Sequence, residues 1–134
     1  MDLFGTAGVR GPVTATVTPE LAVRFGHAVA SVLGAPETPV VVGRDGRATG
    51  LALADAVTAG LLGGGVSVTE LGVATTPLVA FASRDGVGVM VTASHNPPAD
   101  NGLKLFVDGC GADRSIERAV AAEMAETPVP ARWD

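Results

Sequence analysis

Short runs of valine-rich sequence alternate with helical segments along this chain, and that alternation restricts the fold more than any other feature. Residues 40–42 form an apolar, β-branched run typical of a buried strand, residues 66–71 are read as the next strand, and residues 87–91 as a third strand rich in Val. Helical patterns over residues 51–62 and 77–84 separate these strands. Strand, helix and strand in succession require parallel pairing with helices packed over the sheet, so the sequence predicts the α/β class.

The flanking segments complete this prediction. Residues 18–34 are expected to form a helix capped by Thr18, and a last helix is expected to begin near Asp113. Residues 103–107 follow the third strand without a crossover helix, which favours an antiparallel edge strand. We therefore predict one domain over residues 1–134, with three α/β/α layers and a four-stranded, mixed, mostly parallel sheet that has an antiparallel edge strand.

Local signals give further expectations. Thr49 is expected to cap the helix over residues 51–62, which is apolar almost all round and should therefore be sandwiched between other elements. The glycine run at residues 63–65 is expected to end that helix rather than to bind phosphate. His27 lies on the polar face of the first helix and is expected to be solvated. The proline-rich residues 127–134 resemble the start of a linker.

The composition excludes several classes of function. The chain has 14 acidic and 9 basic residues and a net charge of −5, so it lacks the basic surplus of a nucleic-acid-binding protein. With one cysteine and two histidines, it has neither an internal disulfide nor a zinc-type cluster. No apolar run approaches the length of about 20 residues that a membrane helix needs, and no leader is predicted. A reducing cytoplasm is the expected location.

Ser94 is the candidate nucleophile, because it directly follows the predicted buried strand at residues 87–91. Ligands of open α/β sheets bind beyond the carboxyl ends of the strands. The adjacent His95 raises the alternative of a serine hydrolase. That mechanism needs a base that reaches the hydroxyl and an acid that orients the base, and neighbouring extended residues point to opposite sides. A hydrogen-bonded turn is the plainer alternative, since Ser, Asn and Pro favour turns.

Three segments carry a family resemblance. Residues 92–106, Thr-Ala-Ser-His-Asn-Pro-Pro-Ala-Asp-Asn-Gly-Leu-Lys-Leu-Phe, closely resemble the phosphoserine loop of the α-D-phosphohexomutases, the phosphoglucomutase/phosphomannomutase family. Residues 4–11, Phe-Gly-Thr-Ala-Gly-Val-Arg-Gly, are similar to the amino-terminal motif of that family, and residues 41–50 to its Gly-Arg-Asp-x-Arg segment. The segments occur in the family's order, and the resemblance identifies this chain with the amino-terminal domain I.

The resemblance implies a reaction in which a phosphoserine donates its phosphoryl group to a hexose monophosphate. The resulting hexose 1,6-bisphosphate turns round and returns its other phosphate, so that 1-phosphate and 6-phosphate sugars are interconverted. Ser94 would carry the phosphoryl group, Lys104 would accept or donate the proton of the reacting hydroxyl, and Arg10 would be a cation near the transferring group. His95 would support the acid-base step. The remaining supports of the phosphate loop would be Asn96, Thr92, Asn101 and Arg44.

Lys104 is the only lysine in the sequence, and eight arginines supply the other basic side chains. An ammonium group can lose its proton when it is desolvated, which a guanidinium cannot do, so a lysine suits a proton-transfer role. The alternative is a solvated lysine on an edge strand, where it opposes aggregation. Arg44, Asp45 and Arg47 could position a phosphate or hold the loop by salt bridges, and the structural role is favoured. Asp100 is expected to belong to an Asn101-Gly102 tight turn rather than to bind a metal.

The resemblance also implies what this chain lacks. Family members have four domains, and the chain resembles only the first. The implied Mg²⁺ would be held by the phosphate on Ser94 together with carboxylates of a second domain, because Mg²⁺ needs several oxygen ligands. The isolated domain should therefore be almost inactive. Three alternatives remain open: a domain excised from a mutase, a stand-alone phosphosugar-binding module, and a structural interaction domain. Which hexose phosphate is used does not follow from this segment.

Overall fold

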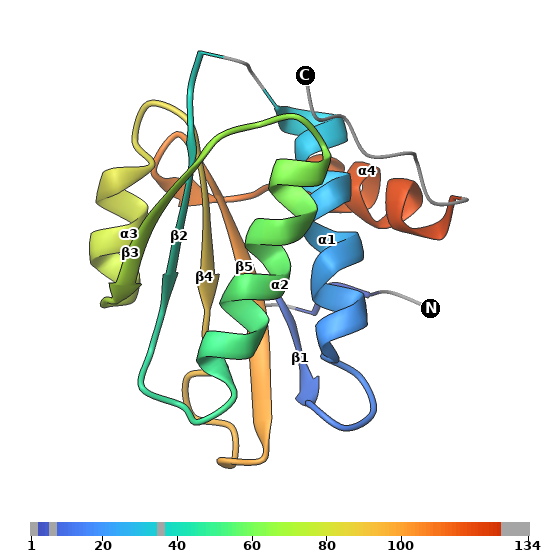
Figure 1. The fold of residues 1–134 in the computed structure, drawn as a ribbon, viewed down its shortest axis with the longest axis vertical. Helices are drawn as coiled ribbons and strands as arrows, with labels where there is room; N and C mark the ends of the chain where they lie inside the picture. The colour runs from blue at the N-terminus through green and yellow to red at the C-terminus, as the bar shows by residue number, and fades with distance from the viewer. Residues whose placement is uncertain (1–2, 6–7, 35–36, 127–134) are drawn as a thin grey trace.

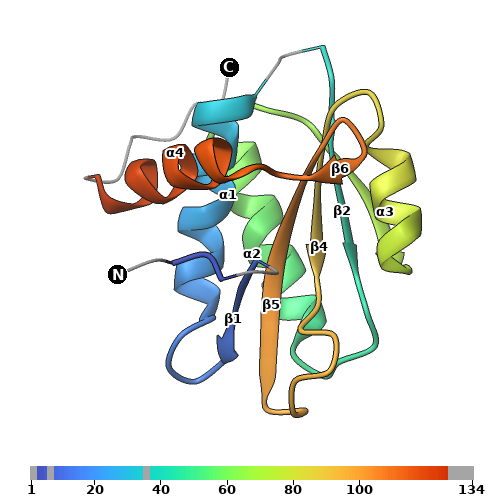
Figure 2. The ribbon, with the colours of Figure 1, turned by 180° about the vertical axis from the view of Figure 1, so that it is seen from behind.

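The computed structural model describes residues 3–5, 8–34 and 37–126, and its central layer is a mixed sheet of six strands (Figures 1 and 2). The strands are β1 (Val9–Pro12), β2 (Val40–Arg44), β3 (Val68–Val73), β4 (Val87–Val91), β5 (Asp100–Val107) and β6 (Cys110–Gly111). Their order is β1-β5-β4-β2-β3, and β6 pairs with β5. Only β5 runs against the common direction, because β4, β1 and β6 are all antiparallel to it, whereas β2 is parallel to both β3 and β4.

The described residues form four helices: α1 and α2 cover one face of the sheet, α3 covers the opposite face, and α4 packs against α1 (Figure 1). The bounds are α1 (Pro19–Leu33), α2 (Gly50–Gly63), α3 (Thr76–Ala82) and α4 (Arg114–Ala125). The main core lies between the sheet, α1 and α2, and its fully buried side chains include Phe25, Leu53 and Leu103. A smaller core of Val79, Met90 and Phe106 lies under α3. The α/β class and the three-layer arrangement are therefore confirmed.

Helix starts follow the predicted capping chemistry in two of three cases. The Thr18 hydroxyl accepts a hydrogen bond from the Leu21 amide, and the Asp113 carboxylate accepts one from the Ile116 amide. The latter bond lowers the pKa of Asp113 from its ordinary value. Thr49 occupies the cap position of α2 but makes no side-chain cap bond, so that prediction was wrong in its chemistry. Its hydroxyl accepts a hydrogen bond from Asn101 instead.

Two expectations about the sheet were wrong. The sheet has six strands rather than four, because β1 and β6 were not predicted. β1 contains Gly11 and Pro12, which are residue types depleted in strands, so the sequence pattern did not indicate a strand there. Since β1 pairs with β5, the antiparallel strand lies inside the sheet rather than at its edge. Lys104 on β5 is therefore not on an edge strand, and the alternative explanation of Lys104 as a solvated edge-strand lysine was wrong.

Two expectations about side-chain exposure also need correction. The imidazole Nε2 of His27 is buried and has no hydrogen-bond partner among the described residues, so His27 is not fully solvated. It lies on α1, which packs closely on α2. α2 contacts α1 and β2, yet Leu51 and Leu62 on its outer side are 54% and 43% exposed, so the helix is not fully sandwiched. The glycine run does end α2, as predicted, and residues 127–134 lie outside the described part of the chain.

Candidate functional site

Ser94 lies just beyond the carboxyl end of β4, between the buried Ala93 and the exposed His95. Its side chain is exposed, and its φ of 52° places it in the left-handed region of backbone conformation. A residue other than glycine pays about 1–2 kcal/mol for this conformation, so the surrounding structure has to hold it there. Because β2 and β3 run parallel to β4, Ser94 stands at the sheet edge where ligands of α/β proteins bind.

Arg10 reaches Ser94 from β1. Its Nη2 atom donates a hydrogen bond of 3.1 Å to Ser94 Oγ, although the two residues are 84 positions apart in the sequence. Arg10 pairs in register with Gly102 of β5, where an added Cβ atom would lie 2.9 Å from Arg10 Cγ. The missing side chain at Gly102 thus leaves room for the arginine. The Nε atom of Arg10 is buried and has no partner among the described residues, so one donor beside Ser94 is unused.

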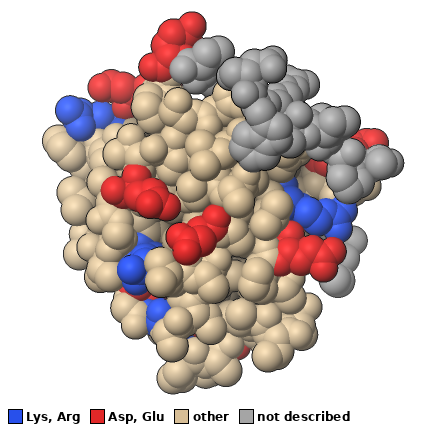
Figure 3. Space-filling model, in the orientation of Figure 1, with Lys and Arg blue, Asp and Glu red and all other residues tan. Residues whose placement is uncertain are grey.

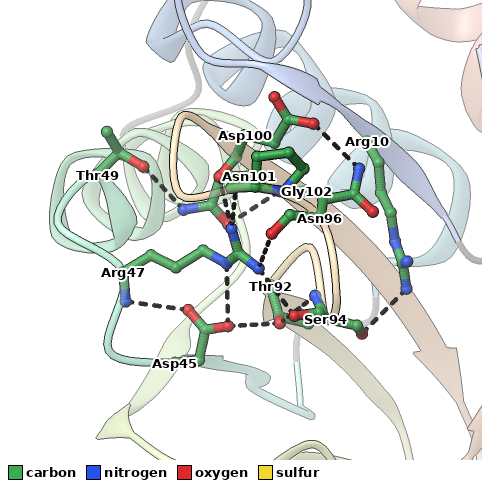
Figure 4. Close-up of polar contacts among 11 residues, drawn as sticks. Arg10, Asp45, Arg47, Thr49, Thr92, Ser94, Asn96, Asp100, Asn101 and Gly102 are labelled. Atoms are coloured by element: carbon green, nitrogen blue, oxygen red, sulfur yellow. Dashed lines mark hydrogen bonds and ion pairs between the residues drawn. The ribbon is translucent and has the colours of Figure 1, made fainter.

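Arg47 is enclosed by the same loop (Figure 4). Its Nη2 atom donates to the carbonyl oxygens of Ser94 and Asn96 at 2.8 and 2.9 Å. Its Nη1 atom donates to those of Pro97 and Asp100 at 2.7 and 3.1 Å. A guanidinium group carries four Nη hydrogens, and each of them has a backbone carbonyl as its partner here. Arg47 therefore holds residues 94–100 as a single turn.

Asp45 connects Arg47 to the start of the loop. Its carboxylate lies 3.6 Å from Arg47 Nε, and it accepts hydrogen bonds from the Arg47 amide at 3.2 Å and from the Thr92 hydroxyl at 2.5 Å. The Thr92 oxygen in turn accepts a hydrogen bond of 3.0 Å from the Ser94 amide. Both peptide groups that flank Ser94 are thereby bound to one polar network.

Two asparagines support the loop from its far side. Asn96 donates to the Asp100 carboxylate at 3.1 Å, and the fully buried Asn101 donates to the Thr49 hydroxyl at 3.0 Å. The expected tight turn at Asn101-Gly102 is wrong, since both residues belong to β5. The turn lies earlier, where the Asp100 amide donates to the Pro97 carbonyl. Pairing of β5 with both β1 and β4 draws Asn101 and Gly102 into the sheet.

The other predicted site residues lie apart from this network. The Lys104 ammonium is 5.3 Å from the ring centroid of Phe106, which is two residues further from the loop along β5. No hydrogen bond joins Lys104 or His95 to Ser94 within the described residues. Of the group Arg44, Asp45 and Arg47, which was expected to hold the loop, Asp45 and Arg47 do so, whereas Arg44 lines a hollow with Asp55 and Glu70 on the α2 side. The sequence segment Gly-Arg-Asp-Gly-Arg did not show which arginine faces the loop.

The contacts of Ser94 do not match a serine hydrolase. A hydrolase nucleophile donates its proton to a neighbouring base, but no hydrogen bond joins Ser94 to His95 among the described residues, and Ser94 Oγ accepts one from the permanently charged Arg10 guanidinium. A guanidinium group beside the Ser94 hydroxyl would stabilise a negative charge at this position. The donor set does not suit a metal by itself, because no cluster of three or more His, Cys, Asp or Glu side chains occurs in residues 3–5, 8–34 and 37–126. Asp45 and Asp100 are already hydrogen-bonded to Thr92 and Asn96.

On the face drawn in Figure 3, acidic and basic side chains are scattered among uncharged ones without a broad basic area. The described helices are all too short or too polar to cross a membrane.

Comparison with known proteins identifies relatives over nearly the whole segment. Residues 1–129 match the family model described as phosphoglucomutase/phosphomannomutase, alpha/beta/alpha domain I. A phosphoglucosamine mutase of Nocardia farcinica is 48% identical over 95% of this chain and 29% of its own length. A phosphopentomutase of Thermococcus kodakarensis is 42% identical over 100% of this chain and 30% of its own length.

A solved structure agrees with these relatives. A phosphoglucomutase/phosphomannomutase family protein of Burkholderia thailandensis superposes with a TM-score of 0.82 at 30% identity, over 92% of this chain and 30% of that one. The chain thus spans less than a third of the length of the proteins that it matches.

Proposed function

Since the chain belongs to the phosphoglucomutase/phosphomannomutase family as its domain I, we propose that Ser94 carries the transferable phosphoryl group of a sugar-phosphate mutase. The observation that supports this most strongly is the placement of Ser94. Its hydroxyl is exposed at the carboxyl edge of the sheet and lies 3.1 Å from a guanidinium nitrogen of Arg10. Arg10 also has an unused, buried Nε donor among the described residues.

The proposed step transfers phosphorus between two oxygens. The bond between Ser94 Oγ and phosphorus breaks, and a bond between phosphorus and a sugar hydroxyl oxygen forms. The proton of that hydroxyl passes to a base, and the released Ser94 oxygen takes up a proton from solvent and becomes a hydroxyl again. Lys104 is proposed as this base in its neutral amine form, which its ammonium reaches by losing a proton when the site is desolvated, and the side chain would have to leave the Phe106 ring to take part. Catalytic hydrogen bonds are often absent before the substrate binds, so the present position of Lys104 is compatible with the role. The bisphosphorylated sugar then returns its other phosphate to Ser94.

Arg10 is proposed to stabilise the phosphoryl group in both states. A phosphoserine carries about −1.5 to −2 charges at neutral pH, and a guanidinium stays protonated under all such conditions. Phosphoryl transfer depends mainly on positioning and on neutralising charge at the equatorial oxygens. Arg10 can supply both, because the sheet fixes its backbone opposite Gly102 and its Nη2 already contacts the serine oxygen.

The rest of the site is proposed to come from outside this chain. A mutase of this family would add Mg²⁺, which would neutralise phosphate charge when bound, and its remaining ligands would be carboxylates of a second domain. The described residues alone hold no carboxylate cluster for the ion. We propose that the isolated chain has negligible mutase activity, and that hexose phosphates and the other domains of a longer enzyme are its partners.

The sugar itself is a finer question. We propose a hexose phosphate as substrate, in keeping with the phosphoglucosamine mutase relative. The phosphopentomutase relative, which matches all of this chain, favours a pentose phosphate as the second candidate. Both candidates use the same phosphoserine chemistry, so the role of Ser94 does not depend on the choice.

A chimera tests the proposal. This chain would replace the matched segment of the Nocardia farcinica relative, and conversion of sugar 1-phosphate to 6-phosphate would be measured with Mg²⁺ present. We expect activity with the unaltered chain and background rates with Ser94→Ala, because this variant removes the proposed phosphoryl carrier. Ser67→Ala changes an exposed serine outside the loop and should leave the rate unchanged.

Two results would count against the proposal. Undiminished activity of the Ser94→Ala chimera would exclude Ser94 as the phosphoryl carrier. A folded chimera without activity, when the intact relative is active in the same assay, would favour the alternative of a phosphosugar-binding or structural module without catalysis.

A further inference from the structure

Arg47 differs from an anion-binding arginine in having no Nη hydrogen left for a ligand. The carbonyl oxygens of Ser94, Asn96, Pro97 and Asp100 accept its four Nη bonds, at distances from 2.7 to 3.1 Å. Its side chain is only 14% exposed, and its Nε faces the Asp45 carboxylate. A phosphate could reach this guanidinium only by breaking the loop.

The bonds of Arg47 act on both sides of Ser94. On the carbonyl side, Arg47 Nη2 donates directly to the Ser94 oxygen at 2.8 Å. On the amide side, the Ser94 N–H donates to Thr92, whose hydroxyl donates to Asp45, the ion-pair partner of Arg47. The residue between these anchors is the one with the disfavoured φ of 52°. Local strain of this kind persists only where the surroundings over-determine the backbone.

We infer that Arg47 is a positioning residue that holds Ser94 in the left-handed conformation and so directs its hydroxyl at Arg10. The consequence for phosphoryl transfer rests on the proposed function, whereas the consequence for the loop conformation does not. Without Arg47, four carbonyl oxygens lose their donor, and Ser94 relaxes toward an ordinary negative φ. Its hydroxyl then leaves the position 3.1 Å from Arg10 Nη2.

Amide hydrogen exchange on the 134-residue chain tests the conformational part. In Arg47→Gln, the amides of Ser94, Asn96 and Asp100 should exchange at least about 10-fold faster, because their hydrogen bonds close the loop that Arg47 holds. Amides of β4 should keep their wild-type rates. Arg118→Gln is the matched control, since it removes the same charge from an exposed position of α4, outside the loop. Unchanged loop exchange in Arg47→Gln would overturn the inference.

If Arg47→Gln does not fold, amide hydrogen exchange is measured on Arg47→Lys instead. Lysine retains the positive charge, but one nitrogen with three donors cannot serve four carbonyl oxygens. The loop amides should therefore exchange several-fold faster than in the wild type even though the charge is kept. Wild-type exchange rates in Arg47→Lys would show that charge alone matters, which would contradict the proposed geometry.

Steady-state kinetics of the chimera tests the catalytic part. Arg47→Lys should lower kcat at least about 10-fold with KM within about twofold, because the hydroxyl is misdirected while the sugar contacts remain. A residue that merely supports folding would lower the melting temperature and the active fraction instead. If KM rises and kcat is kept, Arg47 binds the substrate and the inference is wrong. If even the unaltered chimera is inactive, the proposed function fails, and hydrogen exchange still decides the role of Arg47.

Discussion

Arg10 and Arg47 both place a guanidinium group next to Ser94, but the two groups bind different partners. Arg47 has all its Nη hydrogens on backbone carbonyls, whereas Arg10 donates once to Ser94 and keeps a buried Nε without a partner in the described structure. A guanidinium with free donors at a phosphoserine can form parallel hydrogen bonds to phosphate oxygens. We therefore propose Arg10 as the cation that contacts the phosphoryl group, whereas Arg47 binds the backbone of the loop.

Arg10→Lys tests this division of roles at the level of one residue. Lysine keeps the charge but loses the planar pair of donors, so kcat of the chimera should fall by roughly 10²-fold, comparable to the loss of one donor from an oxyanion site. The melting temperature should stay close to that of the wild type, because Arg10 makes a single side-chain hydrogen bond to the described residues. Arg118→Lys makes the same chemical change at an exposed position of α4 and should have no effect on kcat. A kcat within twofold of wild type in Arg10→Lys would contradict the role.

The loop residues show how far sequence reasoning reaches at this scale. Ser94 could be singled out because it follows a valine-rich strand, and Thr92 and Asn96 belong to the same motif. The contact between Arg10 and Ser94 could not be derived by periodicity, since β1 was not recognised as a strand. Whether Arg44 or Arg47 contacts the loop depends on the residue at which β2 ends, because successive side chains of a strand point to opposite faces. A shift of one residue in the end of the strand would reverse the direction of each side chain.

At the level of elements, the close approach of α1 and α2 fixes the layer behind the site. An added Cβ at Gly26 would lie 2.2 Å from the Val57 carbonyl oxygen, and one at Gly60 would lie 2.1 Å from that of Val23. The two glycines thus let the helix backbones touch. This packing supports α2, and the residue that precedes α2, Thr49, accepts the hydrogen bond of Asn101 below the loop.

Gly26→Ala should therefore destabilise the protein. The new methyl group meets backbone atoms that cannot move independently, so we expect a loss of about 1–3 kcal/mol in the free energy of unfolding, measured by urea denaturation. Gly63→Ala is the control, because an added Cβ there meets nothing within 4 Å, and alanine favours a helix. Its stability should be equal to or greater than that of the wild type. Equal stability of the two variants would show that the helices separate at little cost.

The elements that could be predicted are those with strong local signals. β4 was predicted at its observed bounds, and α1 and α4 follow from their caps and apolar spacing. β3 was placed two residues early, since Val66 is apolar and buried but lies before the paired residues 68–73. β1 and β6 depend on pairing with β5, which is a property of the sheet rather than of either short segment.

For the whole molecule, the sheet gathers segments from distant parts of the chain at one edge. Arg10, Asp45, Arg47 and the loop after β4 come from three separate regions of the sequence and form one network. The chain corresponds to less than a third of the length of its relatives. In the proposed function it supplies the phosphoryl carrier and one cation, and the rest of the mutase site comes from other domains. The sequence could indicate this division only through the family resemblance.

The most direct test of this account is to locate the phosphoryl group. The purified chimera would be incubated with a sugar 1,6-bisphosphate and Mg²⁺, digested, and analysed by fragmentation mass spectrometry. The account predicts one phosphoryl group on Ser94 and none on the neighbouring Thr92, whose hydroxyl is bonded to Asp45. Phosphate on another residue, or an active chimera in which Ser94 is never phosphorylated, would contradict it.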